Sequence, residues 1–413
     1  MDVTAFSMAH DISPELARQA RRQLQHPELA RTLHEQLRVT DCARPAVGTE
    51  LHPSCQMLAH SLRAHQDASL AVSQYFGIAL QQYHTAAEVI RRLERRCPTP
   101  RILDFACGYG RLLNLLIHKV PPERLWASEI QPDAVSFVTN SFGVHGLHSS
   151  ERPEDFDPGK RFDLIWVASL FSHLPPGLFQ RWLGRLAGLL SPQGIMLFTV
   201  HDQALLPAGM EVPEEGVLFI EGSENAELST DIYGTTFVTA AYVQAAVSEV
   251  LGDDYPQLRL PRLINYEQDA YVIGGSPDRD LSEFTDIPRG LRGWLDERHI
   301  EQDGMLHLAG WAASMDSDEP VRIEISLDGE QQSVTSGEAR PRVAEALGKP
   351  GLSHCGWSAA IPLPPDRNET YLRIIARDDR GQHTLIHAGA LDIPVSRRNP
   401  EGSAREGATE KEK

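Results

Sequence analysis

The sequence predicts an α/β protein in which a mostly parallel sheet carries helices on both faces. N-terminal helices are expected before the sheet and an all-β sandwich after it. Three observations predict this class. Apolar residues recur with helical spacing before residue 97. Short apolar runs then alternate with helical stretches, which is typical of buried parallel strands. Beyond residue 290 the apolar period changes to two, which is typical of antiparallel strands.

The N-terminal region, residues 1–55, is expected to be helical. Ser13 can cap a helix and Pro14 suits its first position, and leucines follow in a broken apolar stripe. Residues 56–96 are periodic and free of proline, so they predict a further helix that ends before Pro98.

Strands and helices are expected to alternate through residues 56–275, the predicted nucleotide-binding domain. The expected strands are 101–106, 124–130, 144–150, 162–170, 194–202 and 269–275. The expected helices are 110–120, 132–143, 175–190 and 235–252. The stretch 204–234 is too long for a plain loop, so it should contain a strand or hairpin that covers the site.

The remaining chain divides into three parts. Residues 276–290 are expected to form a linker, and residues 291–395 a β-sandwich with short alternating strands between turn residues. Residues 396–413 contain few apolar residues and are expected to be disordered.

Composition excludes several classes of protein. The formal net charge is −18, which argues against a nucleic-acid substrate, since phosphate backbones bind clustered Lys and Arg. The 5 cysteines form no C-x-x-C pair, which favours a reducing compartment over a disulfide framework. The N-terminal segment lacks the pattern of a signal peptide, and no apolar run reaches the length of a membrane span. We therefore expect a cytoplasmic protein with no membrane span.

The segment 101–120, RILDFACGYGRLLNLLIHKV, reads as a buried strand, a glycine turn and a helix. A backbone of this kind can cradle a nucleotide-like ligand. A dinucleotide fingerprint would require G-x-G-x-x-G, but Leu113 occupies the position of its third glycine, which weakens the interpretation as an NAD-dependent oxidoreductase. No G-x-x-x-x-G-K-[ST] run is present, so a P-loop is excluded.

The turn resembles motif I of class I S-adenosylmethionine-dependent methyltransferases of the small-molecule or glycan type, usually D-x-G-x-G-x-G. Asp104, Gly108 and Gly110 match it, and Ala106 stands at the family's first glycine. The resemblance implies a Rossmann-like, mostly parallel seven-stranded sheet with S-adenosylmethionine as cofactor. Asp104 would hold the cationic end of the methionine moiety. Glu129, followed by Ile130, resembles motif II and would accept the ribose hydroxyls.

Further cofactor contacts follow from the same resemblance. Ser150 and Glu151 fall near the adenine, although the alignment can slide there by one or two residues. Ala168 and Ser169, after the fourth expected strand, would line the sulfur end of the cofactor. The [DN]-P-P-[YF] motif that grips a flipped base is absent, in agreement with the acidic charge.

Histidines after the fourth and fifth strands are the catalytic candidates. His173 is the first choice for a general base or substrate contact, although it could equally orient its loop. His201 could contact the substrate or remain a solvated side chain, and Tyr233 could close the pocket or pack the insertion. His145, His148 and His173 are not spaced to share a helix face, so no metal site is expected.

Two functions remain open. The first is methyl transfer from S-adenosylmethionine to a small molecule or glycan, as O-methylation of a sugar in a cell-surface polysaccharide pathway. The second is a non-catalytic scaffold whose β-sandwich serves as the interaction module. The sandwich resembles modules appended to bacterial enzymes that build surface polysaccharides. It could bind a protein partner or a second copy of the chain, and Trp311 and Trp357 could stack on a sugar or form its core.

Overall fold

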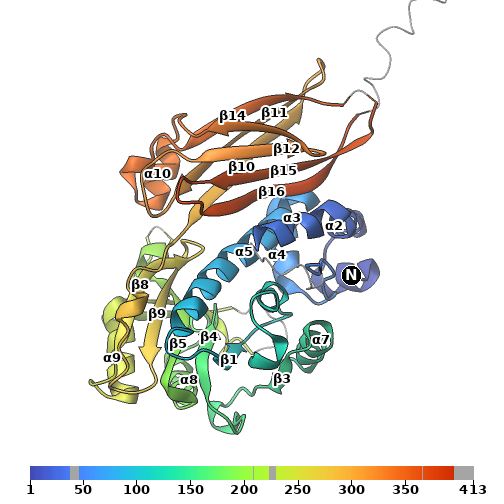
Figure 1. Cartoon of the computed structure of the whole chain (residues 1–413). Coiled ribbons are helices and arrows are strands. Elements are labelled where there is room, and N and C mark those ends of the chain that lie inside the picture. Colours follow the sequence, from blue (N-terminus) through green and yellow to red (C-terminus); the bar gives the residue numbers. More distant parts are fainter. Residues whose placement is uncertain (38–45, 208, 223–228, 365, 395–413) are drawn as a thin grey trace, which may run out of the picture.

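The computed structural model describes residues 1–37, 46–207, 209–222, 229–364 and 366–394 of the chain. The α/β sheet lies at one end and the sandwich at the other, with N-terminal helices between them (Figure 1). Among the residues that the structure describes, no helix combines the length and the apolarity that crossing a membrane would require. The predicted disordered tail lies outside these residues.

The central sheet confirms the predicted fold class. Its strands run in the order β3-β2-β1-β4-β5-β9-β8, and β9 is antiparallel to its neighbours. The strands are β1 (Ile102–Phe105), β2 (Leu125–Glu129), β3 (His145–His148), β4 (Phe162–Val167), β5 (Leu190–Asp202), β8 (Gln257–Ile264) and β9 (Gln268–Gly274). The carboxyl ends of β1, β2, β4 and β5 therefore meet at one edge of the sheet. Strand β8 was not among the expected strands.

A hairpin extends the end of β5. Its strands are β6 (Val217–Glu221) and β7 (Gly234–Val238), and β7 pairs with His201 and Asp202. The expected helix 235–252 is therefore wrong in its first part: β-branched and aromatic residues form β7, and Thr239 caps the helix α9 (Ala240–Leu251).

Helices cover both faces of the sheet (Figure 1). α8 (Pro176–Ala187) and α9 pack into the core on one face. α5 (Ala68–Leu93), α6 (Leu113–Leu116) and α7 (Pro132–Phe142) contribute to the core on the other. α6 is shorter than the expected helix 110–120, because i→i+3 hydrogen bonds alternate with i→i+4 bonds around it.

The helix that the sequence predicts after Ser13 begins there, whereas the helices on either side of it were not predicted separately. Ser13 accepts the Leu16 N–H at the start of the second helix. The expected helix 56–96 is divided in two, because Gln66 has a φ of 52° and Asp67 caps α5. The helices before α5 are α1 (Val3–His10), α2 (Pro14–Gln25), α3 (Pro27–Gln36) and α4 (Gln56–His65).

The C-terminal module is a sandwich of a three-stranded sheet, β10-β11-β14, on a four-stranded sheet, β13-β12-β15-β16. Its strands are β10 (Leu291–Ile300), β11 (Met305–Ser314), β12 (Arg322–Leu327), β13 (Glu330–Thr335), β14 (Gly356–Pro362), β15 (Glu369–Arg377) and β16 (His383–Asp392). A short helix, α10 (Pro341–Leu347), precedes β14. Trp357 is buried in the sandwich core, so it forms core and cannot stack on a sugar, whereas Trp311 is partly exposed.

The outer face of the four-stranded sheet packs on α5, and its residues join the same core as the helices. Hydrogen bonds also cross this contact: the Ala388 N–H donates to Ser73 Oγ at 3.0 Å, and Gln23 bonds both backbone groups of Ala390. Arg298 forms an ion pair with Asp67 at 2.6 Å. The segment 276–290, which connects β9 to β10, packs against α5 as well.

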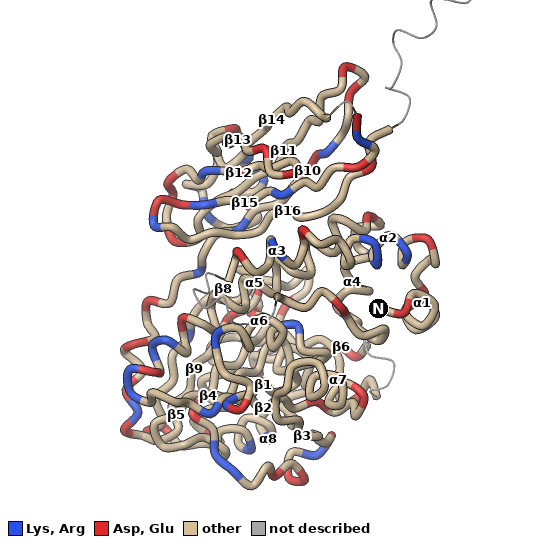
Figure 2. Tube along the Cα trace, turned by 45° about the vertical axis from the view of Figure 1, so that its right-hand side comes forward, with Lys and Arg blue, Asp and Glu red and all other residues tan. Residues whose placement is uncertain are grey.

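Positions of Lys and Arg alternate with positions of Asp and Glu along the traces of the sheet domain and the sandwich (Figure 2).

Candidate active site

A cavity of about 610 Å³ opens at the carboxyl ends of β1, β2, β4 and β5. Helices α4 and α5 close it on one side, and Ile232 and Tyr233, just before β7, close it on another. Twelve of the predicted site residues line it: Asp104, Ala106, Gly108, Glu129, Ile130, Ser150, Glu151, Ala168, Ser169, His173, His201 and Tyr233. The strand ends and the insertion thus surround one cavity.

The two glycines of the turn have different surroundings. Gly108 has a φ of 55°, and a Cβ built on it would meet no atom within 4 Å. Gly110 has a φ of 76°, and a Cβ there would lie 2.5 Å from the Phe142 ring and 2.9 Å from Val138. Gly108 therefore leaves room at the cavity wall, whereas Gly110 allows α7 to approach the turn closely.

Three residues other than glycine adopt left-handed backbone conformations at the cavity, and one of them is Asn265, with a φ of 54° after β8. Ala106 has a φ of 58° after β1, and Ser169 has a φ of 62° after β4. Such conformations cost on the order of 1–2 kcal/mol for residues with a Cβ and cluster at functional sites. Ser169 is held by its backbone N–H, which donates to Thr199 Oγ1 at 2.8 Å.

An acidic pair lies at one end of the cavity. Asp104 is buried, and no hydrogen bond to its carboxyl group is found among the described residues. Burial, and secondly the charge of Glu129, raise the pKa of Asp104 to about 8. Glu129 accepts the N–H of Gly108 at 2.9 Å and that of Ile130 at 2.8 Å. Burial raises the pKa of Glu129 as well.

Arg111 adds a cation to the lining of the cavity, and the sequence reasoning missed it. Its guanidinium lies 5.7 Å from the ring centre of Tyr75 on α5, and both residues line the cavity. Burial lowers the pKa of Arg111. Its place directly after Gly110 was the available signal. Tyr75 gave none, because α5 reaches the cavity only through tertiary packing.

Histidines lie at the other end of the cavity, where their hydrogen bonds fix the ring tautomers. The ring of His173 contacts the Gly234 carbonyl through Nδ1 at 2.7 Å. A carbonyl can only accept, so Nδ1 carries the proton of the neutral ring and Nε2 is its basic nitrogen. Tyr233 stacks on this ring, with the centroids 4.8 Å apart.

His201 is held by Gln268. The Thr199 hydroxyl donates to Gln268 Oε1 at 2.8 Å, which leaves the amide NH₂ of Gln268 to face His201 Nε2 at 3.3 Å. Burial, and secondly the charge of His173, lower the pKa of His201 to about 4, so its ring is neutral near pH 7. His201 Nδ1 is buried and has no hydrogen-bond partner within the described part of the chain.

Residues 78–234 match the family model described as a methyltransferase domain, which spans less than half of the chain. Solved structures are similar over part of the chain. An S-adenosylmethionine-dependent methyltransferase from Clostridium acetobutylicum is 14% identical over 46% of this chain and 91% of its own, with a TM-score of 0.34. A sugar N-methyltransferase from a Streptoalloteichus species is 17% identical over 48% and 88%, with a TM-score of 0.35. An amino pentose methyltransferase from Micromonospora echinaspora is 16% identical over 46% and 91%, with a TM-score of 0.34.

The domain match and the site both indicate an enzyme domain that binds S-adenosylmethionine. S-adenosylmethionine carries an ammonium and a sulfonium cation, a carboxylate and a ribose diol. The buried Asp104 carboxyl group lacks a hydrogen-bond partner among the described residues, so it fits a cation. The guanidinium of Arg111 fits the carboxylate of the cofactor, and Glu129 fits its ribose diol. The chain therefore contains a methyltransferase domain of the kind that uses S-adenosylmethionine. Its methyltransferase domain is residues 78–234 within a Rossmann-like fold, and the β-sandwich is appended to it.

Proposed function

We propose that the enzyme methylates an oxygen of a small molecule or glycan. The preferred acceptor is a sugar hydroxyl in a cytoplasmic step of a cell-surface polysaccharide pathway. The observation that carries this proposal is the orientation of His173, whose Nδ1 is bound by the Gly234 carbonyl so that Nε2 is the basic nitrogen. A hydroxyl is a weak nucleophile and benefits from a positioned base, whereas a neutral amine does not require one.

The lining of the cavity beyond the acidic pair supports an acceptor rich in hydroxyl groups. Its polar side chains include several amides and imidazoles, which both donate and accept hydrogen bonds without a fixed charge. They are Gln56, His60, Gln74, Gln82, His201, Asn265 and Gln268. His201 Nδ1 carries the ring proton, because Gln268 faces Nε2, and it would donate to an acceptor oxygen.

We assign the cofactor contacts to the opposite end of the cavity. When bound there, S-adenosylmethionine supplies the methyl group. Asp104 would hold its ammonium group, Arg111 its carboxylate and Glu129 its ribose hydroxyls. Ser150 and Glu151 lie near the adenine in this assignment, and Ala168 and Ser169 near the sulfur.

A methyl-transfer assay with a panel of nucleotide sugars and glycans tests this proposal. We expect O-methylated product, identified by mass spectrometry and NMR. His173→Ala should lower kcat about 10²–10⁴-fold, the usual contribution of a general base, and leave cofactor affinity unchanged. His148→Ala, an exposed histidine on β3, is the matched control and should behave like wild type.

Three results would overturn parts of the proposal. Wild-type kcat in His173→Ala would remove His173 as the base. Methylation at nitrogen would make the acceptor an amine. Turnover only of acceptors that contain no sugar would contradict a role in a polysaccharide pathway.

A further inference from the structure

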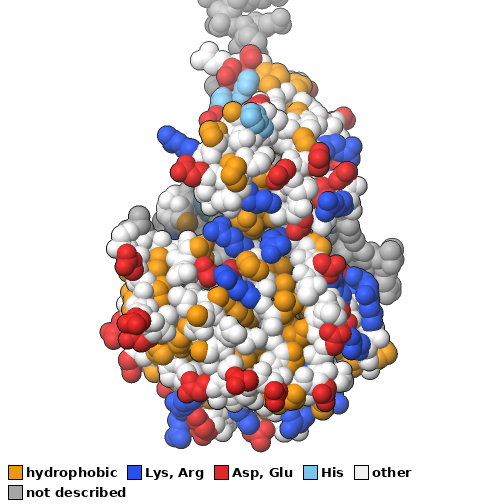
Figure 3. Space-filling model, turned by 90° about the vertical axis from the view of Figure 1, so that its left-hand side faces the viewer, with side chains coloured by type: hydrophobic (Ala, Val, Ile, Leu, Met, Phe, Trp, Pro, Cys, Tyr) orange, Lys and Arg blue, Asp and Glu red, His pale blue; other side chains and the backbone are white. Residues whose placement is uncertain are grey.

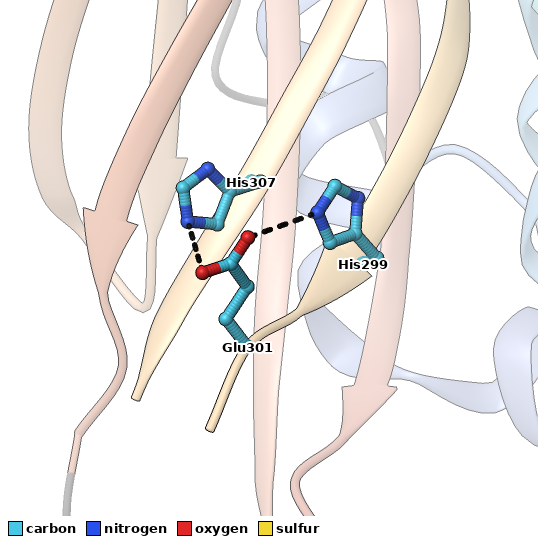
Figure 4. Close-up of side chains that lie close together, drawn as sticks. All are labelled: His299, Glu301 and His307. Atoms are coloured by element: carbon cyan, nitrogen blue, oxygen red, sulfur yellow. Dashed lines mark ion pairs between the residues drawn. The ribbon is translucent and has the colours of Figure 1, made fainter. Parts of the chain in front are cut away.

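Three side chains that could ligate a metal lie at the outer end of the β10–β11 hairpin, on the sandwich. They are His299, Glu301 and His307, and their candidate ligand atoms all lie within 4.8 Å of one another. Figure 4 shows both imidazole rings pointing toward the carboxylate between them. Histidine side chains also reach the surface near this end of the sandwich in the space-filling view (Figure 3). The cluster takes no part in the cavity described above.

The register of the hairpin brings the two histidines together. His299 on β10 and His307 on β11 are direct partners across the antiparallel pair. Their rings stack, with centroids 5.2 Å apart and planes 10° from parallel. Glu301 comes from the turn, where its backbone N–H donates to the Met305 carbonyl at 2.9 Å. Two strands and their turn therefore deliver one ligand each, and the turn hydrogen bond limits how far Glu301 can move.

The separations resemble those around a metal ion more than those of hydrogen bonds. His299 Nε2 lies 3.6 Å from one oxygen of Glu301, and His307 Nε2 lies 3.6 Å from the other. Both distances are too long for hydrogen bonds. Ligand atoms about 2.0–2.1 Å from a tetrahedral zinc ion are roughly 3.3 Å apart. Small rotations of partly exposed side chains would reach that spacing.

The Nε2 atom of His307, which faces Glu301 from β11, is suited to ligate a cation. His307 Nε2 is shielded from water and has no hydrogen-bond partner in the described ranges of the chain. A shielded nitrogen beside a carboxylate is stabilised by a proton or by a metal ion that both groups can share. Two imidazoles and one carboxylate form a donor set for zinc and similar metals. Magnesium and calcium prefer oxygen ligands alone.

We propose that His299, Glu301 and His307 form a binding site for a divalent transition metal, for which zinc is the test ion. Three protein ligands leave one position of a tetrahedral ion open to water or to a group from another molecule. The bound ion joins β10, β11 and their turn, so it also fixes the end of the hairpin. The site is independent of methyl transfer, which requires no metal.

Titration of the full chain with Zn²⁺ by calorimetry tests this proposal. We expect one ion bound per chain, with the stoichiometry checked by elemental analysis after dialysis. Loss of an outer-shell partner typically lowers metal affinity on the order of 10–100-fold, so His299→Ala or His307→Ala should lower it by at least that factor. Glu301→Gln should weaken binding in the same direction. His148→Ala, an exposed histidine far from the hairpin in sequence, should bind zinc like wild type.

Amide hydrogen exchange provides the second measurement. Zinc should slow exchange around residues 299–307 in the wild type and leave it unchanged in His307→Ala. Unchanged thermal unfolding of the metal-free variants would show that they fold. Zinc binding of wild-type affinity in both histidine variants would place the ion elsewhere and overturn the proposal. Absence of any zinc binding by the wild type would do the same.

Discussion

At the scale of single residues, burial raises the pKa values of both carboxyl groups at the acidic end of the cavity. Asp104 lies at the end of a buried strand, and burial raises its pKa from the ordinary value of 3.8 to about 8. Glu129 remains satisfied by two backbone N–H groups, which favour its charged form against burial. The ligand-free site therefore holds a carboxyl group that is largely protonated below pH 8.

Cofactor binding should release a proton from Asp104. A cation placed beside the carboxyl group favours its charged form, so the bound state holds fewer protons and affinity rises with pH up to about pH 8. Calorimetry with S-adenosylmethionine in two buffers of different ionisation enthalpy measures the release. Asp104→Asn should bind more weakly and release no proton. Heats that do not depend on the buffer in the wild type would contradict this assignment.

The raised pKa of Asp104 also predicts how the stability of the fold depends on pH. Because the folded pKa is raised, the folded chain binds more protons than the unfolded chain between about pH 4 and pH 8. The contribution of Asp104 to stability is therefore complete below the unfolded pKa and is lost as pH rises through 8. Urea unfolding across this range should show a smaller decline in Asp104→Asn than in the wild type. An identical decline in both would mean that Asp104 does not titrate in this range.

Alanine substitutions should separate the roles of the two glycines. Gly110→Ala forces a Cβ against Phe142 and adds a strained φ, so we expect a loss of about 2–4 kcal/mol in the free energy of unfolding. Gly108→Ala adds only the strained φ, at a cost of about 1–2 kcal/mol, but places a methyl group at the cavity wall. Urea unfolding and cofactor titration measure the two effects. Equal stability losses with equal cofactor affinity would refute the distinction.

At the scale of elements, the β6–β7 hairpin positions the catalytic candidate. The Gly234 N–H donates to the His173 carbonyl at 2.9 Å, and the Gly234 carbonyl accepts from the His173 ring at 2.7 Å. The Thr236 N–H donates to the Ser172 carbonyl at 2.7 Å. The hairpin therefore fixes both the loop after β4 and the ring at its end, and a change in the hairpin should affect chemistry more than cofactor binding.

Gly234→Ala tests this coupling. A Cβ at Gly234 would lie 2.4 Å from the Ile220 carbonyl oxygen, so the hairpin must shift. We expect kcat to fall at least tenfold, since the base loses its orientation. The dissociation constant of S-adenosylmethionine should stay within about twofold, because Asp104 and Glu129 lie on other strands. Gly337→Ala is the control, because a Cβ at Gly337 would meet no atom within 4 Å and its backbone is not left-handed. A wild-type kcat in Gly234→Ala would disprove the coupling.

At the scale of the whole molecule, α5 joins the sheet domain to the sandwich. This helix of 26 residues buries 18 of them, and its surroundings include both the central sheet and β16. One apolar core thus continues from α6 through α5 to Tyr371 and Leu385 in the sandwich. This face of the sandwich is covered by the chain itself. Any protein partner or second copy would have to bind another face, and such association remains a prediction.

A shared core predicts cooperative unfolding. We expect the full chain to unfold in a single calorimetric transition, because separation of the sandwich exposes the buried face of α5. A chain that ends at residue 290 should unfold at a lower temperature and bind a hydrophobic dye. A chain that ends at residue 394 is the control and should unfold like the full chain. Two separate transitions, with an unchanged transition in the 290-residue chain, would show that the domains are independent.

Local sequence patterns predicted most of the fold, and they named twelve of the residues that line the cavity. The alternation of apolar strands and helices predicted the sheet, and the cofactor end was predicted because Asp104, Gly108 and Glu129 follow strands that the motif itself identifies. The predicted helix boundaries were wrong where tertiary contacts compete with helix propensity. Gln66 divides the helix expected over residues 56–96, and residues 235–238 form a strand on the end of β5 instead of the start of a helix. The exact limits of the domains remain a prediction.

The sequence by itself predicted the fold class, the cofactor and the edge of the sheet at which the candidate cofactor residues meet. All three depend on residues close together along the chain, whose backbone geometry is set locally. Only the tertiary structure decided which side chains complete the site. Arg111 meets Tyr75 through packing of α5, His173 is oriented by Gly234 61 residues away, and His299 faces His307 through strand register. Contacts of this kind depend on how elements pack, which spacing along one sequence does not encode.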